Sequence, residues 1–256
     1  MKKTDLVRIH HADYQDDIPF WISWTEGNQP VLEVGCGHGR VALPLLVEGR
    51  EVVGVDFDLD AIQSLRADLS GKESELQARA KIIHTDIFEF PPQGLFGAVI
   101  IPCNTFSTFT AEERQQLIDR VFQHLKPEGV FAASMPNPVL VRSLYEEIKI
   151  SGDQAEPDIE TSFPHPGTGF PVQVSSTLAI RDKSLGWDWI YDHLHPDGQV
   201  DRFVRSTEHY LSTLETYLHE LSGAGFDEIL TMGDFDSSEY STDSPYLILI
   251  ARKPGS

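Results

Sequence analysis

The sequence predicts an α/β fold, a doubly wound seven-stranded sheet that carries an inserted antiparallel β meander. Three observations support this prediction. Strand and helix patterns alternate over the first half of the chain, and apolar runs such as FGAVII at residues 96–101 are typical of strands buried on both faces. After about residue 150 the pattern changes to longer segments of alternating polarity. The chain of 256 residues is long enough to bury a full core.

The first half contains five predicted strands, three of which are followed by a helical pattern. Asp58 is the expected N-cap of the helix after the second strand, and Thr110 with Glu113 forms a capping box for the helix after the fourth strand. This alternation predicts βαβ units and a parallel sheet of the Rossmann-like type. The five strands are predicted at residues 31–34, 51–55, 81–84, 96–101 and 130–134.

The second half is predicted to leave this sheet and to return to it. Residues 151–169 are rich in Pro, Gly, Asp and Ser, which predicts a loop. An antiparallel meander is expected next, and two further strands complete the main sheet. The meander segments are predicted at residues 172–180, 185–194 and 202–211, and the last two strands at 226–231 and 246–251.

The domain boundaries follow from this change of pattern. A second capping box at Ser212–Glu215 predicts a helix that ends near Gly223 and leads back into the main sheet. We therefore expect a main domain at residues 1–150 and 212–256 and an inserted subdomain at residues 151–211.

Charge and composition exclude several classes of protein. The chain has 40 acidic and 20 basic residues, so its formal net charge is −20. Affinity for nucleic acids and for anionic membranes depends on Lys and Arg, so we expect neither as a partner. Two cysteines cannot hold together a secreted disulfide scaffold. Because no signal peptide and no apolar span of membrane length is visible, we expect a cytoplasmic protein, and a homodimer stays open.

A glycine-rich loop after the first strand is the sharpest motif. Glu33–Gly39 reads EVGCGHG, and glycines at a spacing of two let the backbone turn tightly and approach a ligand. Asp56 ends the second strand, 21 residues after Gly35. In a doubly wound sheet this carboxylate lies beside the loop, where it can accept both hydroxyls of a ribose.

Other interpretations of the loop stay open. Nicotinamide dinucleotides prefer the form GxGxxG, but Arg40 stands at the position of the third glycine, and a glycine stands at position 39 instead. A purely structural turn is a further alternative. Asp86 follows the third strand, and Cys103 with Asn104 follows the fourth, at the carboxyl edge where such sheets bind ligands.

These motifs together resemble the class I S-adenosylmethionine-dependent methyltransferases. Residues 31–56 match that family's glycine loop and its ribose-binding acid. Residues 14–21 (YQDDIPFW) and the segments at 225–226 and 233–236 are similar to a bacterial small-molecule branch, which is related to sugar N,N-dimethyltransferases and glycine N-methyltransferases. Relatives in this branch do not share one substrate.

The resemblance implies S-adenosyl-L-methionine as cofactor and assigns residues to it. Asp56 would hold the ribose, and Asp86 with Ile87 would contact the edge of the adenine. Glu33 would support the loop amides or the cofactor amine. The remaining cofactor contacts that the resemblance implies are Tyr14, Gly35, Cys36, Gly37, Phe57 and Cys103.

The acceptor side is less constrained by the sequence. Trp187, Trp189, Tyr191 and His193 share one parity, so they project from one face of a strand. They form either a hydrophobic patch or a substrate wall, and we take Trp189 and Tyr191 as candidate substrate residues. Asn104 and His193 are the candidate catalytic residues. No Cys/His group has zinc spacing, so we expect no metal site.

The predicted activity is methyl transfer to a nitrogen or oxygen of a small-molecule acceptor. Two alternatives stay open at this stage: an oxidoreductase that binds a nucleotide cofactor, and a non-catalytic protein that binds S-adenosylmethionine. The net charge of −20 favours a small, neutral or cationic acceptor over a nucleic acid.

Overall fold

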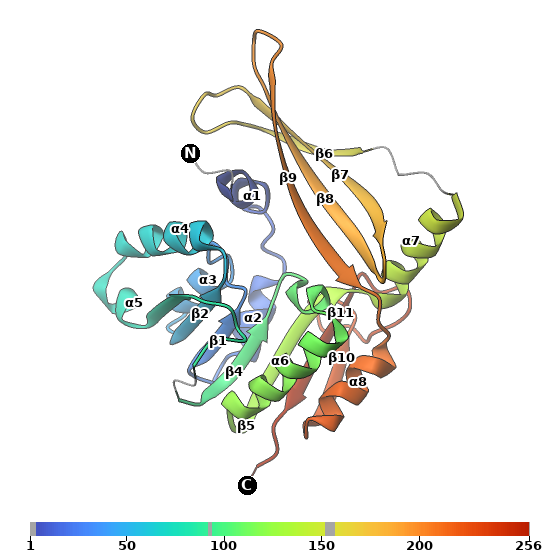
Figure 1. Ribbon diagram of the computed structural model, residues 1–256. Helices are drawn as coiled ribbons and strands as arrows, with labels where there is room; N and C mark the ends of the chain where they lie inside the picture. Colours follow the sequence, from blue (N-terminus) through green and yellow to red (C-terminus); the bar gives the residue numbers. More distant parts are fainter. Residues whose placement is uncertain (1–3, 92–93, 152–156, 256) are drawn as a thin grey trace. The chain divides into compact units, whose positions relative to one another are not determined.

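A computed structural model describes residues 4–91, 94–151 and 157–255 of the chain. The chain divides into two compact units, each with its own sheet (Figure 1). The larger unit comprises Tyr14–Pro138 and Ser212–Ser256, and the smaller unit comprises Met1–Asp13 and Val139–Leu211.

Within the described residues, seven strands form the sheet of the larger unit in the order β10-β11-β5-β4-β1-β2-β3 (Figure 1). Strands β1 to β5 pair in parallel, and β11 runs antiparallel to both β5 and β10. The predicted doubly wound sheet is therefore confirmed. Its strands are β1 (Val31–Val34), β2 (Val52–Asp56), β3 (Ala80–His84), β4 (Phe96–Ile101), β5 (Leu125–Pro136), β10 (Asp227–Met232) and β11 (Tyr246–Arg252).

Helices cover both faces of this sheet. Val31 packs into the core cluster on the side of α2, α3 and α4, whereas Leu32 packs on the side of α6 and α8. Successive residues of β1 thus serve opposite cores, which explains the continuous apolar runs. The helices of this unit are α2 (Ile18–Trp24), α3 (Ala42–Val47), α4 (Leu59–Ser70), α5 (Ser74–Ala78), the 3-10 turn η1 (Thr105–Thr108), α6 (Ala111–His124) and α8 (Leu214–Gly223).

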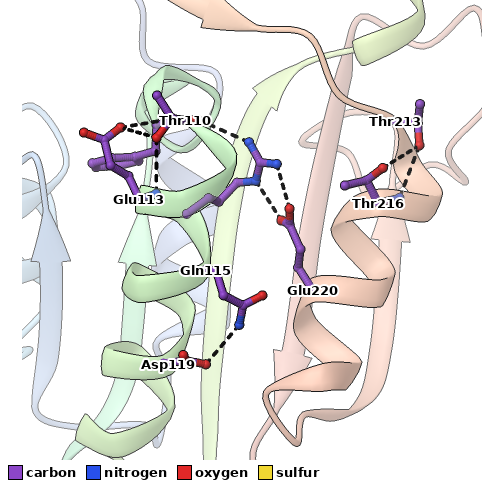
Figure 2. Close-up of polar contacts among 9 residues, drawn as sticks. Thr110, Glu113, Gln115, Asp119, Thr213, Thr216 and Glu220 are labelled. Carbon is purple, nitrogen blue, oxygen red and sulfur yellow. Dashed lines mark hydrogen bonds and ion pairs between the residues drawn. The ribbon is translucent and has the colours of Figure 1, made fainter.

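The helix caps show how local sequence starts these elements. Asp58 caps α4 by accepting from the amides of residues 60 and 61, as predicted. Thr110 and Glu113 form the predicted capping box of α6 (Figure 2). The capping box predicted at Ser212 and Glu215 is wrong. The N-cap of α8 is one residue later, where the hydroxyl of Thr213 accepts from the Thr216 amide (Figure 2).

A buried ion pair joins α6 to α8. Arg114 donates to both carboxylate oxygens of Glu220 at 2.7 Å, and its guanidinium lies 4.8 Å from the ring centroid of Tyr217. Arg114 is 2% exposed. A charge this deep needs its partner, so the pair fixes how the two helices pack.

The smaller unit contains a four-stranded antiparallel sheet within the described residues, in the order β6-β7-β8-β9. The three predicted meander segments are β7 (Pro171–Arg181), β8 (Ser184–Leu194) and β9 (Val200–Tyr210). β6 (Asp158–Pro164) lies in the segment predicted as loop, so that prediction is wrong there. Nearly all β6 side chains are exposed, and such a strand has no apolar pattern to reveal it.

Two helices belong to the smaller unit, which differs from the expected domain boundaries. Leu6 on α1 (Thr4–His10) packs with Val172, Val174 and Tyr191, and Tyr145 on α7 (Pro138–Ser151) donates to the Asp182 carbonyl at 2.9 Å. These contacts explain why the first residues and α7 group with the smaller sheet, whereas we expected them in the main domain. Residues 152–156 of the expected insertion lie outside the described residues.

In the described part of the chain, no helix is both long enough and apolar enough to cross a membrane.

Candidate functional site

The glycine loop lies between β1 and α3, at the carboxyl end of β1. Gly35, Gly37 and Gly39 have φ angles of 74°, 51° and 85°, a region that glycine adopts at no steric cost. The amides of Gly35 and Cys36 both donate to the carbonyl of Val55, at 2.9 and 3.1 Å. The loop is thus tied to β2 and turns over the edge where doubly wound sheets bind ligands.

Close packing beneath the loop explains two of its residues. A Cβ on Gly39 would lie 2.4 Å from Cδ1 of Leu65 on α4, so a larger residue there would force the Leu65 side chain to move. Cys36 is buried, and its sulfur fills the space over Gly54, where a Cβ would lie only 2.8 Å away. Burial raises the pKa of the Cys36 thiol, which keeps it neutral. The Cys36 side chain thus packs as a core residue beneath the loop, and its contact with a cofactor stays a prediction.

Asp56 is held toward the loop by two backbone amides. Its Oδ2 accepts from the Gly37 amide and its Oδ1 from the Asp58 amide, each at 2.8 Å. A carboxylate oxygen can accept a second hydrogen bond, so one acceptor position remains on each oxygen. Asp56 is therefore oriented to accept two neighbouring hydroxyl groups, as the sequence predicted for a ribose.

The Glu33 side chain places a buried carboxyl group behind the loop, and one of its oxygens lacks a hydrogen-bond partner among the described residues. The side chain is 2% exposed, and among the described residues its Oε2 has no hydrogen-bond partner. Burial raises the pKa of Glu33 to about 8, while Arg40 acts to lower it and Asp56 to raise it. A buried carboxyl group with an unpaired oxygen is costly, and a cationic or N–H donor beside that oxygen would remove the cost. This group fits the ammonium of an amino-acid moiety.

Arg40 joins three segments that are distant in the chain. Its guanidinium donates to both carboxylate oxygens of Asp17 at 2.6 Å, to the Tyr14 carbonyl at 3.0 Å and to the Cys103 sulfur at 2.8 Å. It also lies 5.0 Å from the ring centroid of Tyr14. Asp17 in turn accepts from the Trp21 indole at 2.9 Å. The N-terminal segment is thereby locked to the glycine loop and to the end of β4.

The sequence did not reveal Arg40 and Asp17 as residues of this site. Arg40 stands out in the sequence only because it replaces a glycine of the dinucleotide motif. Asp17 lies 23 positions away in the segment at residues 14–21, where the resemblance assigns a role to Tyr14 alone. The sequence signal for this contact is an arginine immediately after the loop. A guanidinium that is largely buried there needs an acidic partner.

The end of β4 has an unusual backbone. Cys103 and Asn104 are both in the left-handed region, with φ angles of 59° and 64°. Two consecutive non-glycine residues there carry strain, and strain of this kind concentrates at ligand sites. The Asn104 carbonyl accepts from the amide and hydroxyl of Ser107, at 3.3 and 2.8 Å. These bonds support the turn that sets the Asn104 side chain at the carboxyl edge of the sheet.

The residues predicted for an adenine follow β2 and β3. Phe57 is 72% exposed, and its carbonyl accepts from Nε2 of His84 at 2.9 Å, which ties the two strand ends together. Asp86 Oδ1 accepts from the Phe88 amide at 2.9 Å, and Ile87 is buried. An exposed aromatic face next to Asp56 suits the plane of a base, and Asp86 keeps a second carboxylate oxygen for a donor.

Comparison with known proteins shows which protein family this part of the chain resembles. Residues 31–129 match the protein family described as a methyltransferase domain. This segment of the chain is similar to a methyltransferase domain. Its glycine loop, Asp56, Asp86 and Asn104 all lie inside the matched range, whereas Tyr14 and Asp17 precede it.

Three relatives extend the likeness beyond the methyltransferase domain. A glycine/sarcosine N-methyltransferase of Aphanothece halophytica is 24% identical over 99% of this chain and 88% of its own. A crystal structure of an S-adenosylmethionine-dependent methyltransferase from Clostridium acetobutylicum has a TM-score of 0.74, with 13% identity, over 97% of this chain and 96% of its own. The sugar N-methyltransferase KedS8 of Streptoalloteichus sp. has a TM-score of 0.72, with 17% identity, over 99% and 93%. The chain therefore has the fold of S-adenosylmethionine-dependent methyltransferases over nearly its whole length.

The candidate residues of the meander belong to the smaller unit. Tyr191 is fully buried, and its hydroxyl lies 3.0 Å from Nδ1 of His10 on α1. Trp189 is partly exposed and stacks on Trp187 at 5.8 Å. Tyr191 thus packs as a core residue of its unit, while Trp189 keeps surface for a contact. Their roles toward a substrate, and that of His193 as a base, stay predictions.

Proposed function

We propose that this chain uses S-adenosylmethionine to methylate a nitrogen or oxygen of a small-molecule acceptor. The observation that carries the proposal is the set of acids around the glycine loop. Asp56 is oriented by two amides with acceptor positions to spare, and Glu33 is buried with an unpartnered oxygen. The first suits a ribose and the second suits the ammonium of a methionine moiety.

The cofactor supplies the reactive group, so the chain's own residues need only bind and orient. S-adenosylmethionine carries its methyl group on a sulfonium, which is a good leaving group. Glu33 as carboxylate would hold the ammonium and Asp56 the ribose of the cofactor, and Gly35 with Gly37 would let the backbone approach it. The remaining requirement is to align the acceptor and to keep water out.

Asn104 is the residue that we assign to the acceptor. Its position after β4, in a backbone turn supported by Ser107, presents a side-chain amide at the carboxyl edge. The amide oxygen can accept from an acceptor N–H and so orient the nitrogen lone pair. An amine that is neutral needs no base, whereas a hydroxyl acceptor benefits from one.

Two observations support a small acceptor with nitrogen as the favoured atom. The net charge of −20 disfavours binding to a polyanion. Among the known proteins that match nearly the whole chain, one is named as a glycine/sarcosine N-methyltransferase and another as a sugar N-methyltransferase. A small neutral or cationic amine is consistent with both.

The dinucleotide alternative has a specific obstacle. Its third glycine allows close packing of helix and strand, and here that position is Arg40, which is engaged with Asp17 and Cys103. A pyrophosphate would also bring two negative charges to a loop bordered by the Asp56 carboxylate, and like charges repel.

Calorimetry followed by turnover tests the proposal. We expect the full-length protein to bind S-adenosylhomocysteine and not NAD⁺, and Asp56→Ala to weaken that binding. With S-adenosylmethionine and a panel of glycine, amino sugars, hydroxylated metabolites and transfer RNA, we expect release of S-adenosylhomocysteine with a small amine.

Each contrary outcome selects a different conclusion. Binding of NAD⁺ without S-adenosylhomocysteine would refute the methyltransferase assignment. Turnover with transfer RNA alone would refute the small acceptor. Cofactor binding without turnover on any acceptor would support the non-catalytic alternative.

A further inference from the structure

Three histidines and an aspartate gather where two hairpins of the smaller sheet meet. We call His165, His193, His195 and Asp201 the histidine cluster. The chain positions them in a defined way, because His193 on β8 faces Asp201 on β9 in register, and His195 follows two residues later on the same side. His165 comes from the connection between β6 and β7.

The turn that carries His195 is held by its own backbone. The His195 amide donates to the carbonyl of Gln199 at 2.9 Å, and the Gly198 amide donates to the carbonyl of His195 at 3.0 Å. His195 Nε2 lies 2.9 Å from Asp201 Oδ2. Ligand groups based on paired strands and a closed turn are held more precisely than groups on an open loop.

The ring orientations decide which histidines can share one ion. A metal ion lies in the plane of the imidazole that binds it. His165 and His193 are stacked at 4.0 Å with an interplanar angle of only 11°, so no ion can lie in both planes. His193 and His195 are 4.2 Å apart at 53°, and their planes do intersect. The candidate ligand atoms of His193, His195 and Asp201 all lie within 4.8 Å of one another.

His193 has the surroundings of a metal-binding histidine. Its Nε2 lies 2.8 Å from the Thr168 hydroxyl, which leaves Nδ1 for an ion. Ligating histidines usually make such a contact through the nitrogen that does not bind the metal.

We propose that His193, His195 and Asp201 bind one divalent transition-metal ion, with Zn²⁺ as the reference ion. Two nitrogen donors and one carboxylate suit zinc and its neighbours in the first transition row, whereas Mg²⁺ and Ca²⁺ prefer oxygen donors throughout. Three protein ligands also leave a coordination position for water or another small ligand.

The geometry allows the small closure that binding requires. Ligand bonds of about 2.0–2.2 Å place neighbouring donors roughly 3.3 Å apart, less than the present 4.8 Å limit. The Asp201 side chain is 78% exposed and that of His195 is 26% exposed, so both can move toward the buried His193. An ion there would tie up the His193 lone pair, which excludes the role of general base predicted for that residue.

Zinc binding to the full-length protein tests the proposal without reference to its activity. The protein, freed of any affinity tag and stripped with a chelator, is titrated with ZnCl₂ by calorimetry, and Co²⁺ binding is followed by visible absorption. We expect one Zn²⁺ per chain and no competition by Mg²⁺. His195→Gln and Asp201→Asn, both at the accessible turn, should each weaken Zn²⁺ binding at least about tenfold.

His219→Gln is the matched control, because this exposed histidine of α8 lies outside the histidine cluster. It should bind Zn²⁺ like the unmodified protein. Absence of Zn²⁺ binding, unchanged binding by either cluster variant, or an equal loss in the control would each overturn the proposal. Thermal unfolding of each variant without metal shows whether it is folded.

Discussion

Replacing Asp56 by asparagine tests the part of the site on which the proposed function depends most. The two carboxylate oxygens accept from the Gly37 and Asp58 amides at 2.8 Å each. Asparagine keeps one oxygen and replaces the other by an NH₂ group, which can only donate. One backbone amide must then face another donor, and one of the two ribose contacts loses its acceptor.

The expected loss follows from these two bonds. A hydrogen bond to a charged group contributes about 1.5–3 kcal/mol, which corresponds to a roughly 10- to 150-fold lower affinity for S-adenosylhomocysteine. The unpaired loop amide costs about 1–3 kcal/mol of folding free energy where it stays shielded from water. Asp56→Asn should therefore reduce both cofactor affinity and stability.

Calorimetric titration with S-adenosylhomocysteine and urea unfolding measure the two losses separately. Asp60→Asn is the matched control, because this exposed residue lies in the first turn of α4, four positions after Asp56. We expect the control to change either quantity by less than about 0.5 kcal/mol. If Asp56→Asn binds the cofactor as tightly as the control does, the assignment of Asp56 to the ribose is refuted.

Three further substitutions probe the surrounding structure. Burial raises the pKa of Glu33 from about 4.5 to about 8, so the free energy of unfolding should fall as pH rises across that window. Glu33→Gln should flatten this pH dependence in thermal unfolding. At pH 9 the same variant should bind S-adenosylhomocysteine more weakly. A steeper slope in the variant would contradict the buried, unpartnered carboxylate. In urea unfolding, Gly39→Ala should lower the free energy of unfolding by about 1–3 kcal/mol more than Gly49→Ala does. Both glycines have a positive φ, but only the Cβ at position 39 would meet a side chain. Equal losses would mean that backbone strain alone is the cause. Glu220→Ala should cost about 3–5 kcal/mol by leaving Arg114 charged and buried, and a loss below 1 kcal/mol would show that the helices repack.

Much of the larger unit could be predicted because its signals are local. The apolar runs of β1 to β5 and the caps at Asp58 and Thr110 depend on residues a few positions apart. The glycine loop and Asp56 are also local, since a strand end and a loop define them. Their juxtaposition follows from the parallel order of the sheet, which the alternation of strands and helices predicts.

Other features escaped prediction because no local pattern carries them. β6 is an exposed strand that exists by pairing with β7, so its sequence reads as loop. The grouping of α1 and α7 with the smaller sheet depends on contacts such as Leu6 with Tyr191, far apart in the chain. The apolar pattern of these segments does not say which core will receive them.

The sequence by itself determined the doubly wound sheet, the glycine loop and the acid beside it, because periodicity, caps and glycine spacing act within one or two elements. Only the tertiary structure decided that Arg40 locks Asp17 and Cys103 around that loop, that Glu33 Oε2 has no hydrogen-bond partner among the described residues, and that His193, His195 and Asp201 converge. Each of these depends on charge and burial shared between segments brought together by folding. A buried charge must find its partner wherever the fold supplies one, and the linear spacing of residues does not record that choice.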